Sequence, residues 1–295
     1  MRNILKSLIP DTLLQSLRAY LVQRNRRNIC QLSHRTEQLL EPVNNVEHYY
    51  HFLFDLCLPL HLTLQAASPN AKFSLRDFGI FTERLPLLFP DRVKIVGKDH
   101  DTDGLTCRPL NGMNPVFMRL SRQELESFTS HVLTTLDIDS TASPNKILLI
   151  ERLPPESYFV NQATKKGGGA SRRSIPNFQE FVESLQNRIQ SPYELQTVQL
   201  EKLSFQEQIQ LFHQAVLVIG QHGAGLANAI WMRPESSMIE LSNVPKLVHF
   251  RNICQVMGHS HHLYPTDGAH VAIDIDDFSS WLSGEDGLEQ LLETQ

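Results

Sequence analysis

The sequence predicts an α/β protein built from two modest domains, and three observations lead to this prediction. Short apolar runs alternate with amphipathic helical patterns over residues 145–282, which favours a parallel sheet with right-handed crossovers. The length of 295 residues suits one large domain or, as we expect, two smaller ones. Residues 140–145 are small, polar and proline-bearing, which makes them the best linker candidate. We therefore expect an N-terminal domain over residues 1–140, a C-terminal domain over 145–282 and a tail or helix over 283–295.

Composition and charge exclude several classes of protein. Apolar residues make up 41% of the chain and charged residues 20%, which is ordinary for a soluble protein with a packed core. A net charge of −5 without a long basic run argues against nucleic acid as a partner. No apolar run approaches the roughly 18 residues of a membrane helix. We expect residues 4–9 to form a packing helix, with peripheral contact to the inner membrane as the alternative.

Cysteine usage points to a reducing compartment. The four cysteines are far apart and form no CxxC pair, so the chain has neither a zinc framework nor a disulfide scaffold. A reduced, cytoplasmic chain is the simplest interpretation.

The elements of the N-terminal half follow from local patterns. Residues 1–40 and 45–65 are expected to be helical, residues 72–75 and 92–96 to be strands, and residues 122–136 to form a helix.

The C-terminal half is more regular. Strands are expected at 146–150, 193–200, 215–219 and 238–241, with a loop over 154–173. Asn177 is expected to cap one helix, Ser204 and Glu207 to form the capping box of the next, and a third helix to begin near Gly225.

The most informative motif is a glycine turn after the 215–219 strand. Gly220, Gly223 and Gly225 let the backbone approach a ligand where a Cβ would collide, and the helix that follows offers unpaired N–H groups. His222 lies between two of these glycines and can donate a hydrogen bond to a phosphate oxygen. The pattern predicts a phosphate site, although a tight turn without a ligand has the same local sequence.

An acidic residue ends the apolar strand that follows this turn. Glu240 at such a position can accept hydrogen bonds from both hydroxyls of a ribose. The alternative is an ordinary solvent-exposed strand end.

A polar pair interrupts the apolar segment 45–65. If this segment is helical, His51 and Asp55 share one face, and the carboxylate orients the imidazole and raises its basicity. The pair is then a candidate general base, with a structural hydrogen bond as the alternative. A metal site that includes His48 has no clear fourth ligand.

Further charged residues are weaker candidates. Arg173 and Asn177, with Lys165 and Lys166, follow a strand end where cations can neutralise a diphosphate, although the lysines suit a solvated loop. The tract of His259, His261 and His262 is interpreted as an exposed polar turn rather than as a metal site. The Asp-x-Asp pair at 274 and 276 lies too near the C-terminus for us to favour a metal–diphosphate role.

Together these motifs resemble glycosyltransferase family 61. The block from Gly220 through His222, Gly223, Ala224, Gly225 and Asn228 to Glu240 is similar to the most distinctive block of that family, and residues 203–212 also resemble it. Arg173 and Asn177 match its Arg-x-Ile-x-Asn element, with Phe178 where an acidic residue often follows. His51, Asp55 and Pro59 fit its N-terminal His…Asp…Pro element.

The resemblance implies a GT-B-like architecture, in which two Rossmann-like domains face each other across a cleft. It implies inverting transfer from a nucleotide sugar, usually a UDP-sugar, without an essential divalent metal or other cofactor. His51 and Asp55 then act on the acceptor hydroxyl. Arg173, Asn177, the 220–228 segment and Glu240 bind the donor.

The expected acceptor is a glycan or a lipid-linked glycan, in the synthesis of a surface polysaccharide such as a capsule. Two alternatives stay open at this stage. One is another nucleotide-sugar enzyme of GT-B fold, such as an epimerase, and the other is a non-catalytic nucleotide-binding assembly protein.

Overall fold

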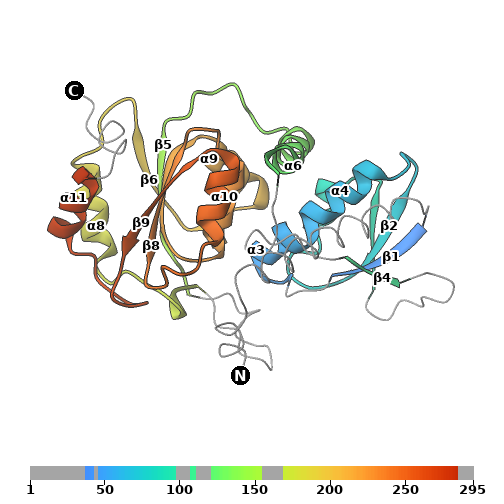
Figure 1. The fold of residues 1–295 in the computed structure, drawn as a ribbon, viewed down its shortest axis with the longest axis horizontal. Helices are drawn as coiled ribbons and strands as arrows, with labels where there is room; N and C mark the ends of the chain where they lie inside the picture. The colour runs from blue at the N-terminus through green and yellow to red at the C-terminus, as the bar shows by residue number, and fades with distance from the viewer. Residues whose placement is uncertain (1–36, 43–45, 98–106, 111–120, 155–168, 285–295) are drawn as a thin grey trace, which may run out of the picture. The chain divides into compact units, whose positions relative to one another are not determined.

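The chain divides into two compact units, residues 1–135 and residues 136–295. The computed structural model describes residues 37–42, 46–97, 107–110, 121–154 and 169–284 (Figure 1). Each unit is built around its own parallel sheet, so the predicted α/β class is confirmed. Predictions for residues 1–36, 155–168 and 285–295, which include the amphipathic N-terminal segment, Lys165 and Lys166, lie outside the described residues.

The described part of the first unit holds a four-stranded parallel sheet in the order β3-β2-β1-β4. Its strands are β1 (Glu37–Pro42), β2 (Lys72–Arg76), β3 (Val93–Val96) and β4 (Cys107–Leu110). The helix predicted over residues 1–40 is therefore wrong at its end, because residues 37–40 belong to β1, and β4 was not predicted. Strand β1 pairs on both sides, with β2 and β4, and this pairing outweighs its weak local preference.

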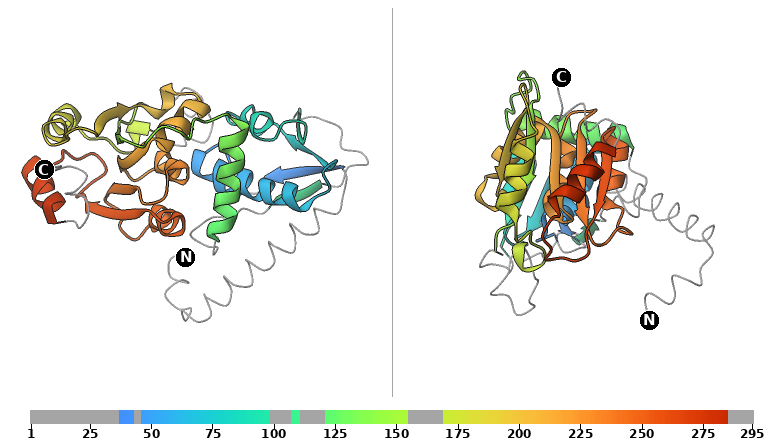
Figure 2. Two further views of the ribbon diagram at one scale, coloured as in Figure 1. Left: turned by 90° about the horizontal axis from the view of Figure 1, so that it is seen from above. Right: turned by 90° about the vertical axis from the view of Figure 1, so that its left-hand side faces the viewer.

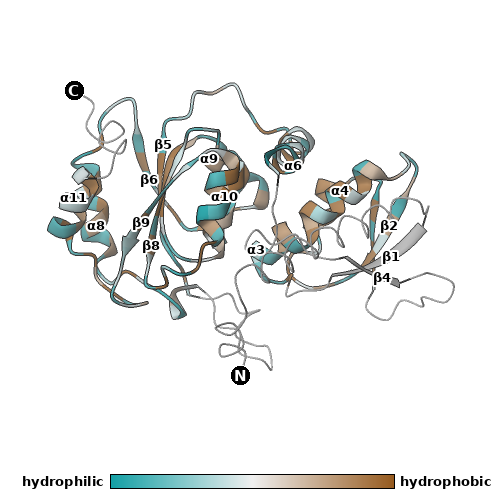
Figure 3. Cartoon of the chain, in the orientation of Figure 1, coloured by the Kyte–Doolittle hydropathy of each residue, from teal (hydrophilic) through white to brown (hydrophobic). Residues whose placement is uncertain are grey.

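The helical segment after β1 changes its winding. It consists of α3 (Tyr49–His51), the π-helix η1 (Phe52–Cys57) and α4 (Leu58–Ala66). The side chains of η1 are all buried, and Figure 3 shows that α4 is mostly hydrophobic. The helix predicted over 45–65 is present, but a π-helical stretch was not predicted. Helices α5 (Arg84–Leu88) and α6 (Arg122–Thr135) complete this unit as described.

Two histidines whose rings pack in a tilted arrangement connect α4 to α6. The ring centroids of His61 and His131 lie 4.9 Å apart, and His61 Nε2 lies 3.1 Å from Ser127 Oγ. His61 is only 4% exposed. Burial, together with the nearby His131, lowers the pKa of His61 from 6.5 to about 4. The folded state therefore binds this proton less tightly than the unfolded state does.

We expect acid to destabilise the first unit through His61. A histidine with a depressed pKa in the folded state contributes stability above pH 6.5, and this stability is lost as the pH falls toward 4, by about 3 kcal/mol at most. Urea unfolding at pH 7 and pH 4.5 measures the loss. In a His61→Gln variant, which keeps an N–H donor but does not titrate, the loss should be smaller. An equal loss in both proteins would contradict this role of His61.

The described part of the second unit holds a five-stranded parallel sheet in the order β6-β5-β7-β8-β9. Its strands are β5 (Lys146–Ile150), β6 (Glu194–Val198), β7 (Ala215–Gln221), β8 (Ser237–Ser242) and β9 (Ser260–Pro265). Helices α8 (Phe178–Gln186) and α11 (Ile275–Gly284) cover one face (Figures 1 and 2). Helices α9 (Phe205–His213) and α10 (His249–Met257), with the 3₁₀ helix η4 (Ala224–Trp231), cover the other.

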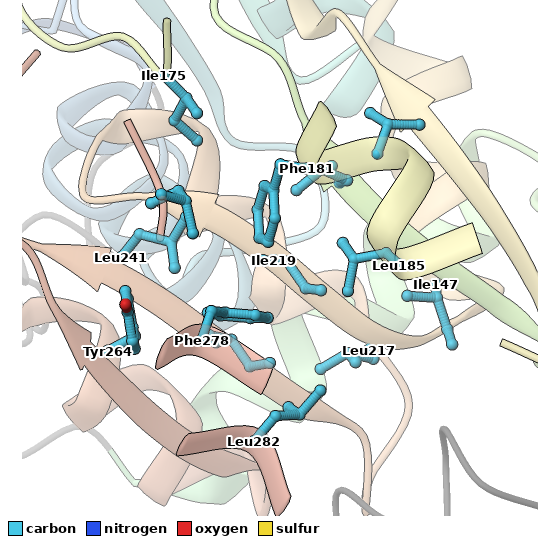
Figure 4. Packing of buried hydrophobic residues seen from close by; sticks show 14 residues of the cluster. Ile147, Ile175, Phe181, Leu185, Leu217, Ile219, Leu241, Tyr264, Phe278 and Leu282 are labelled. Atoms are coloured by element: carbon cyan, nitrogen blue, oxygen red, sulfur yellow. The ribbon is translucent and has the colours of Figure 1, made fainter. Parts of the chain in front are cut away.

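Alternation along the strands divides the buried side chains between the two faces. Ile219 of β7 and Leu241 of β8 pack with Phe181 of α8 and Phe278 of α11 in one apolar cluster (Figure 4). Because successive residues of a strand point to opposite faces, Glu240 lies on the α10 side. The Glu240 carboxylate is therefore buried beneath α10.

Three local predictions meet different outcomes. The capping box is confirmed, since the Glu207 N–H donates to Ser204 Oγ and the Ser204 N–H donates to the Glu207 carboxylate. Asn177 does stand just before α8, but its side chain makes no capping bond. The helix expected after the glycine turn is a 3₁₀ helix, which is tighter than an α-helix.

No described helix is both long and apolar enough to cross a membrane.

Candidate active site

The strand order of the second unit marks the position of a ligand site. The chain passes from β5 to β6 on one side and then returns to β7 on the other side of β5. In open parallel sheets, ligands bind beyond the carboxyl ends of the strands at such a switch point. The residues that follow β5 and β7 flank this point, and the glycine turn is one of these two segments.

An arginine that sequence reasoning missed lies against the glycine turn. Arg152, two residues after β5, donates from Nη1 to the carbonyl oxygen of His222 at 3.3 Å and from Nε to that of Gly169 at 3.2 Å. A Cβ built on Gly223 would lie 2.2 Å from Arg152 Nη1. A side chain at this position would therefore force the guanidinium of Arg152 to move. The position of Arg152 just beyond a strand end was the signal that could have revealed it.

We expect Gly223→Ala to displace Arg152 and to weaken nucleotide binding at least tenfold, since contacts to charged groups are worth about 1.5–3 kcal/mol. Gly268→Ala is the matched control, because a Cβ there meets nothing within 4 Å. Calorimetric titration with a nucleoside diphosphate measures both variants. Equal affinity of the two would show that the approach of Arg152 to the turn is not needed.

Further guanidinium groups gather near Arg152. Burial and the charge of Arg173 lower the pKa of Arg152 to about 10. Burial and the charge of Arg172 lower the pKa of Arg173, while Glu240 acts in the opposite direction. The Nε of Arg173 is buried and makes no hydrogen bond to any described residue. The amide of Gln221, at the end of β7, donates to the carbonyl oxygens of Ser174 and Ala269 and so holds this segment beside the turn.

A buried carboxylate holds two histidines at the same strand ends. His222 Nδ1 lies 2.5 Å from Glu240 Oε1, and His261 Nε2 lies 2.7 Å from Glu240 Oε2. Burial raises the pKa of Glu240, but the hydrogen bonds from His222 and His261 outweigh burial and bring the pKa below its usual value. Glu240 is therefore a carboxylate that accepts from both imidazoles.

This arrangement corrects two predictions. Glu240 does not end its strand, because β8 continues to Ser242, and the residue is 1% exposed with both oxygens already bonded. The alternative of a solvent-exposed strand end is therefore wrong, whereas the binding of ribose hydroxyls by Glu240 stays a prediction. His261 is not in an exposed turn but in β9, with a side chain only 7% exposed. Tertiary packing of β9 under α10 buries a tract that looks polar in sequence.

The side-chain amides of the two predicted asparagines make hydrogen bonds within the protein. Asn177 Nδ2 donates to the Ile273 carbonyl and its Oδ1 accepts from the Ile273 N–H, at 2.8 and 2.9 Å. Asn228 is fully buried, donates to the Gly225 carbonyl and accepts from the Trp231 indole. Both amides thus fix the backbone around the turn and the 269–273 segment.

The remaining residues of the turn shape its backbone. Ala224 begins η4, and Leu226 N–H donates to the Gly223 carbonyl. Since the first N–H groups of a helix have no partner within it, η4 itself provides no acceptor for the amides of Ala224 and Gly225, which makes them candidate donors to a ligand. Gly220 lies close to Leu226 and Ile150, where a Cβ would be tight.

The first unit carries the predicted His–Asp pair. His51 Nδ1 lies 2.5 Å from Asp55 Oδ2, across the junction between α3 and η1. The Asp55 side chain is fully buried while that of His51 is 35% exposed, so an anchored carboxylate supports an imidazole that reaches solvent. Asp55 Oδ1 is buried and makes no hydrogen bond to a described residue. With burial as the larger cause, Asp55 also raises the pKa of the adjacent Tyr50.

Among the described residues, no metal site is formed by His48 with the His51–Asp55 pair or by His259, His261 and His262. No group of three or more His, Cys, Asp or Glu side chains there is arranged to hold a metal ion.

Comparison with known proteins identifies the family. The family model described as Glycosyltransferase 61 matches residues 49–239, which include the His51–Asp55 pair and the glycine turn. No curated protein matches the chain. The match spans more than half of the 295 residues, and the chain therefore belongs to glycosyltransferase family 61.

Proposed function

We propose that this glycosyltransferase transfers a sugar from a nucleoside-diphosphate sugar to a hydroxyl group with inversion at the anomeric carbon. The donor diphosphate binds at the carboxyl ends of β5 and β7. The observation that supports this site best is the convergence of Arg152, Arg173 and His222 beside the glycine turn. UDP-sugars are the expected donors, as the family resemblance implies.

The electrostatics of these side chains favour an anionic ligand. Burial is the larger cause of the lowered pKa of Arg152 and of Arg173, and repulsion adds to it, from Arg173 at Arg152 and from Arg172 at Arg173. Like charges held together in this way are stabilised when an anion binds between them. A diphosphate carries the charge and the acceptor oxygens that guanidinium groups match best.

The chemistry of inversion assigns the other roles. A base removes the proton from the acceptor hydroxyl, its oxygen bonds to the anomeric carbon, and the bond from that carbon to the donor phosphate breaks. Negative charge then grows on the departing diphosphate. Arg152, Arg173, His222 and the amides of Ala224 and Gly225 stabilise that charge. We expect these donors to act without a divalent metal, so that a chelator leaves activity unchanged.

The base belongs to the first unit in this proposal. His51 is half-exposed and its Nδ1 is held by Asp55, which leaves Nε2 for the acceptor hydroxyl. This is the support that a carboxylate gives an imidazole base in many enzymes. We further propose a GT-B arrangement, an acceptor glycan of a surface polysaccharide, and action in the cytoplasm with peripheral contact to the inner membrane.

A panel of donors tests the function. The melting temperature of the full chain is measured with UDP-, GDP-, CMP- and dTDP-sugars at millimolar concentration. We expect at least one donor, a UDP-sugar first, to raise it, since a ligand at about 100 times its Kd stabilises by about 2.7 kcal/mol. No shift with any of these donors would contradict the proposed site.

A further inference from the structure

The residues around His222 restrain its ring on two sides. Its Nδ1 is bonded to Glu240, and its ring packs edge-on against Phe250 of α10 with the centroids 5.1 Å apart. Its Nε2 has no hydrogen-bond partner among the described residues. Because Glu240 is charged and can only accept, the Nδ1 of His222 carries a proton. The direction in which Nε2 points is thus set by the orientation of the Glu240 carboxylate.

The Glu240 carboxylate is itself held from the other side. In the sheet, His261 of β9 pairs with Met238 of β8, so His261 and Glu240 lie diagonally on the same face. His261 Nε2 donates to Glu240 Oε2 at 2.7 Å, and both side chains are almost completely buried. A carboxylate with a single partner turns about its last torsion, whereas one with a partner on each oxygen is fixed.

We propose that His261 is a positioning residue that fixes His222 through Glu240 and thereby sets the affinity for the donor diphosphate. This inference rests on the proposed function, in which His222 donates from Nε2 to a phosphate oxygen while Nδ1 donates to Glu240. Both ring nitrogens donate only in the imidazolium, so the Glu240 carboxylate and the diphosphate stabilise that form together. His261 itself touches no ligand. It also keeps the Glu240 carboxylate charged, since a buried carboxylate that loses a donor protonates more readily. A protonated Glu240 would instead donate a hydrogen bond to an unprotonated Nδ1, and it would no longer stabilise the imidazolium form of His222.

Affinity measurements on three variants test this role. His261→Phe removes the donor and keeps an aromatic ring, while His261→Gln restores an N–H near the Nε2 position. His262→Phe is the control, because the next residue on β9 points to the opposite face. Calorimetry gives the Kd for whichever of UDP, GDP, CDP, ADP and dTDP binds the wild-type chain most tightly. We expect His261→Phe to raise Kd about tenfold or more, and His261→Gln and His262→Phe to stay within about threefold of wild type.

A merely structural role for His261 would lower the melting temperature of His261→Phe and leave Kd unchanged, and that result overturns the proposal. A second measurement does not depend on a nucleotide. Long-range ¹H–¹⁵N spectra of the free wild-type chain and of His261→Gln should show His222 protonated at Nδ1. Protonation at Nε2 alone would overturn the proposal even if nucleotides bind. If no nucleoside diphosphate binds the wild-type chain while Nδ1 is protonated, the proposed function fails and the restraint on His222 stands.

Discussion

Replacing Arg152 with methionine should weaken nucleotide-sugar binding by about a hundredfold. The guanidinium of Arg152 donates to the carbonyl oxygens of His222 and Gly169, and it is one of the cations that face the proposed diphosphate. If the guanidinium makes two contacts to phosphate oxygens, each worth about 1.5–3 kcal/mol, their loss costs about 3 kcal/mol or more of binding free energy. Methionine keeps an unbranched apolar stem in place of the arginine stem, so the loss mainly reflects charge and hydrogen bonds. Calorimetric titration with the best donor measures it.

Arg188→Met is the matched control for Arg152→Met. Arg188 follows the end of α8. A helix that connects parallel strands begins near their carboxyl ends and finishes near their amino ends, so Arg188 lies at the end of the sheet opposite the proposed site. The control removes one positive charge from the same unit, far from the proposed site. A similar loss of affinity in both variants would mean that Arg152 acts only through the overall charge of the protein.

Replacing Asp55 with asparagine should lower turnover by about 10²- to 10⁴-fold, the range that general base catalysis contributes. The amide is isosteric, but it does not stabilise the imidazolium that forms when His51 takes a proton, and it can favour the wrong tautomer. Donor binding should be unchanged, because the residues proposed to bind the donor belong to the second unit. Steady-state rates with the donor found by the thermal panel, together with a donor Kd, measure both effects.

The double variant His51→Ala, Asp55→Asn checks the same assignment. If the two residues act as one catalytic unit, the double variant should be no slower than the slower single variant. The effects of substitutions within one such unit are not additive. Normal turnover in the double variant would show that this pair is not the base.

Local signals in the sequence predicted the glycine turn and the strands β5 to β8 of the second unit, whereas β9 was not predicted. The apolar run that became β7 is fully buried apart from one half-buried residue, and such a run is typical of a central parallel strand. The capping box at Ser204 and Glu207 depends only on residues three apart, so it was also predictable. The His51–Asp55 contact follows from one helical turn, and a change to π-winding did not prevent it.

Contacts between distant segments were not predictable in the same way. Arg152 and His222 are 70 residues apart, and only the pairing of β5 with β7 brings them together. The role of His261 depends on the register of β9 against β8 and on the cover that α10 provides. Asn177 stands at the expected capping position, but its side-chain amide bonds instead to the carbonyl and the N–H of Ile273. Local periodicity can be recognised in a single sequence, whereas the register between strands that are distant in sequence cannot.

The most direct test of the account is a crystal structure of the full chain with a bound nucleoside diphosphate. We expect the diphosphate beyond the carboxyl ends of β5 and β7, with Arg152 and Arg173 bonded to phosphate oxygens. We also expect His222 Nε2 within hydrogen-bond distance of the diphosphate and His222 Nδ1 still bonded to Glu240. A nucleotide bound elsewhere, or a diphosphate that none of Arg152, Arg173 and His222 contacts, would contradict it.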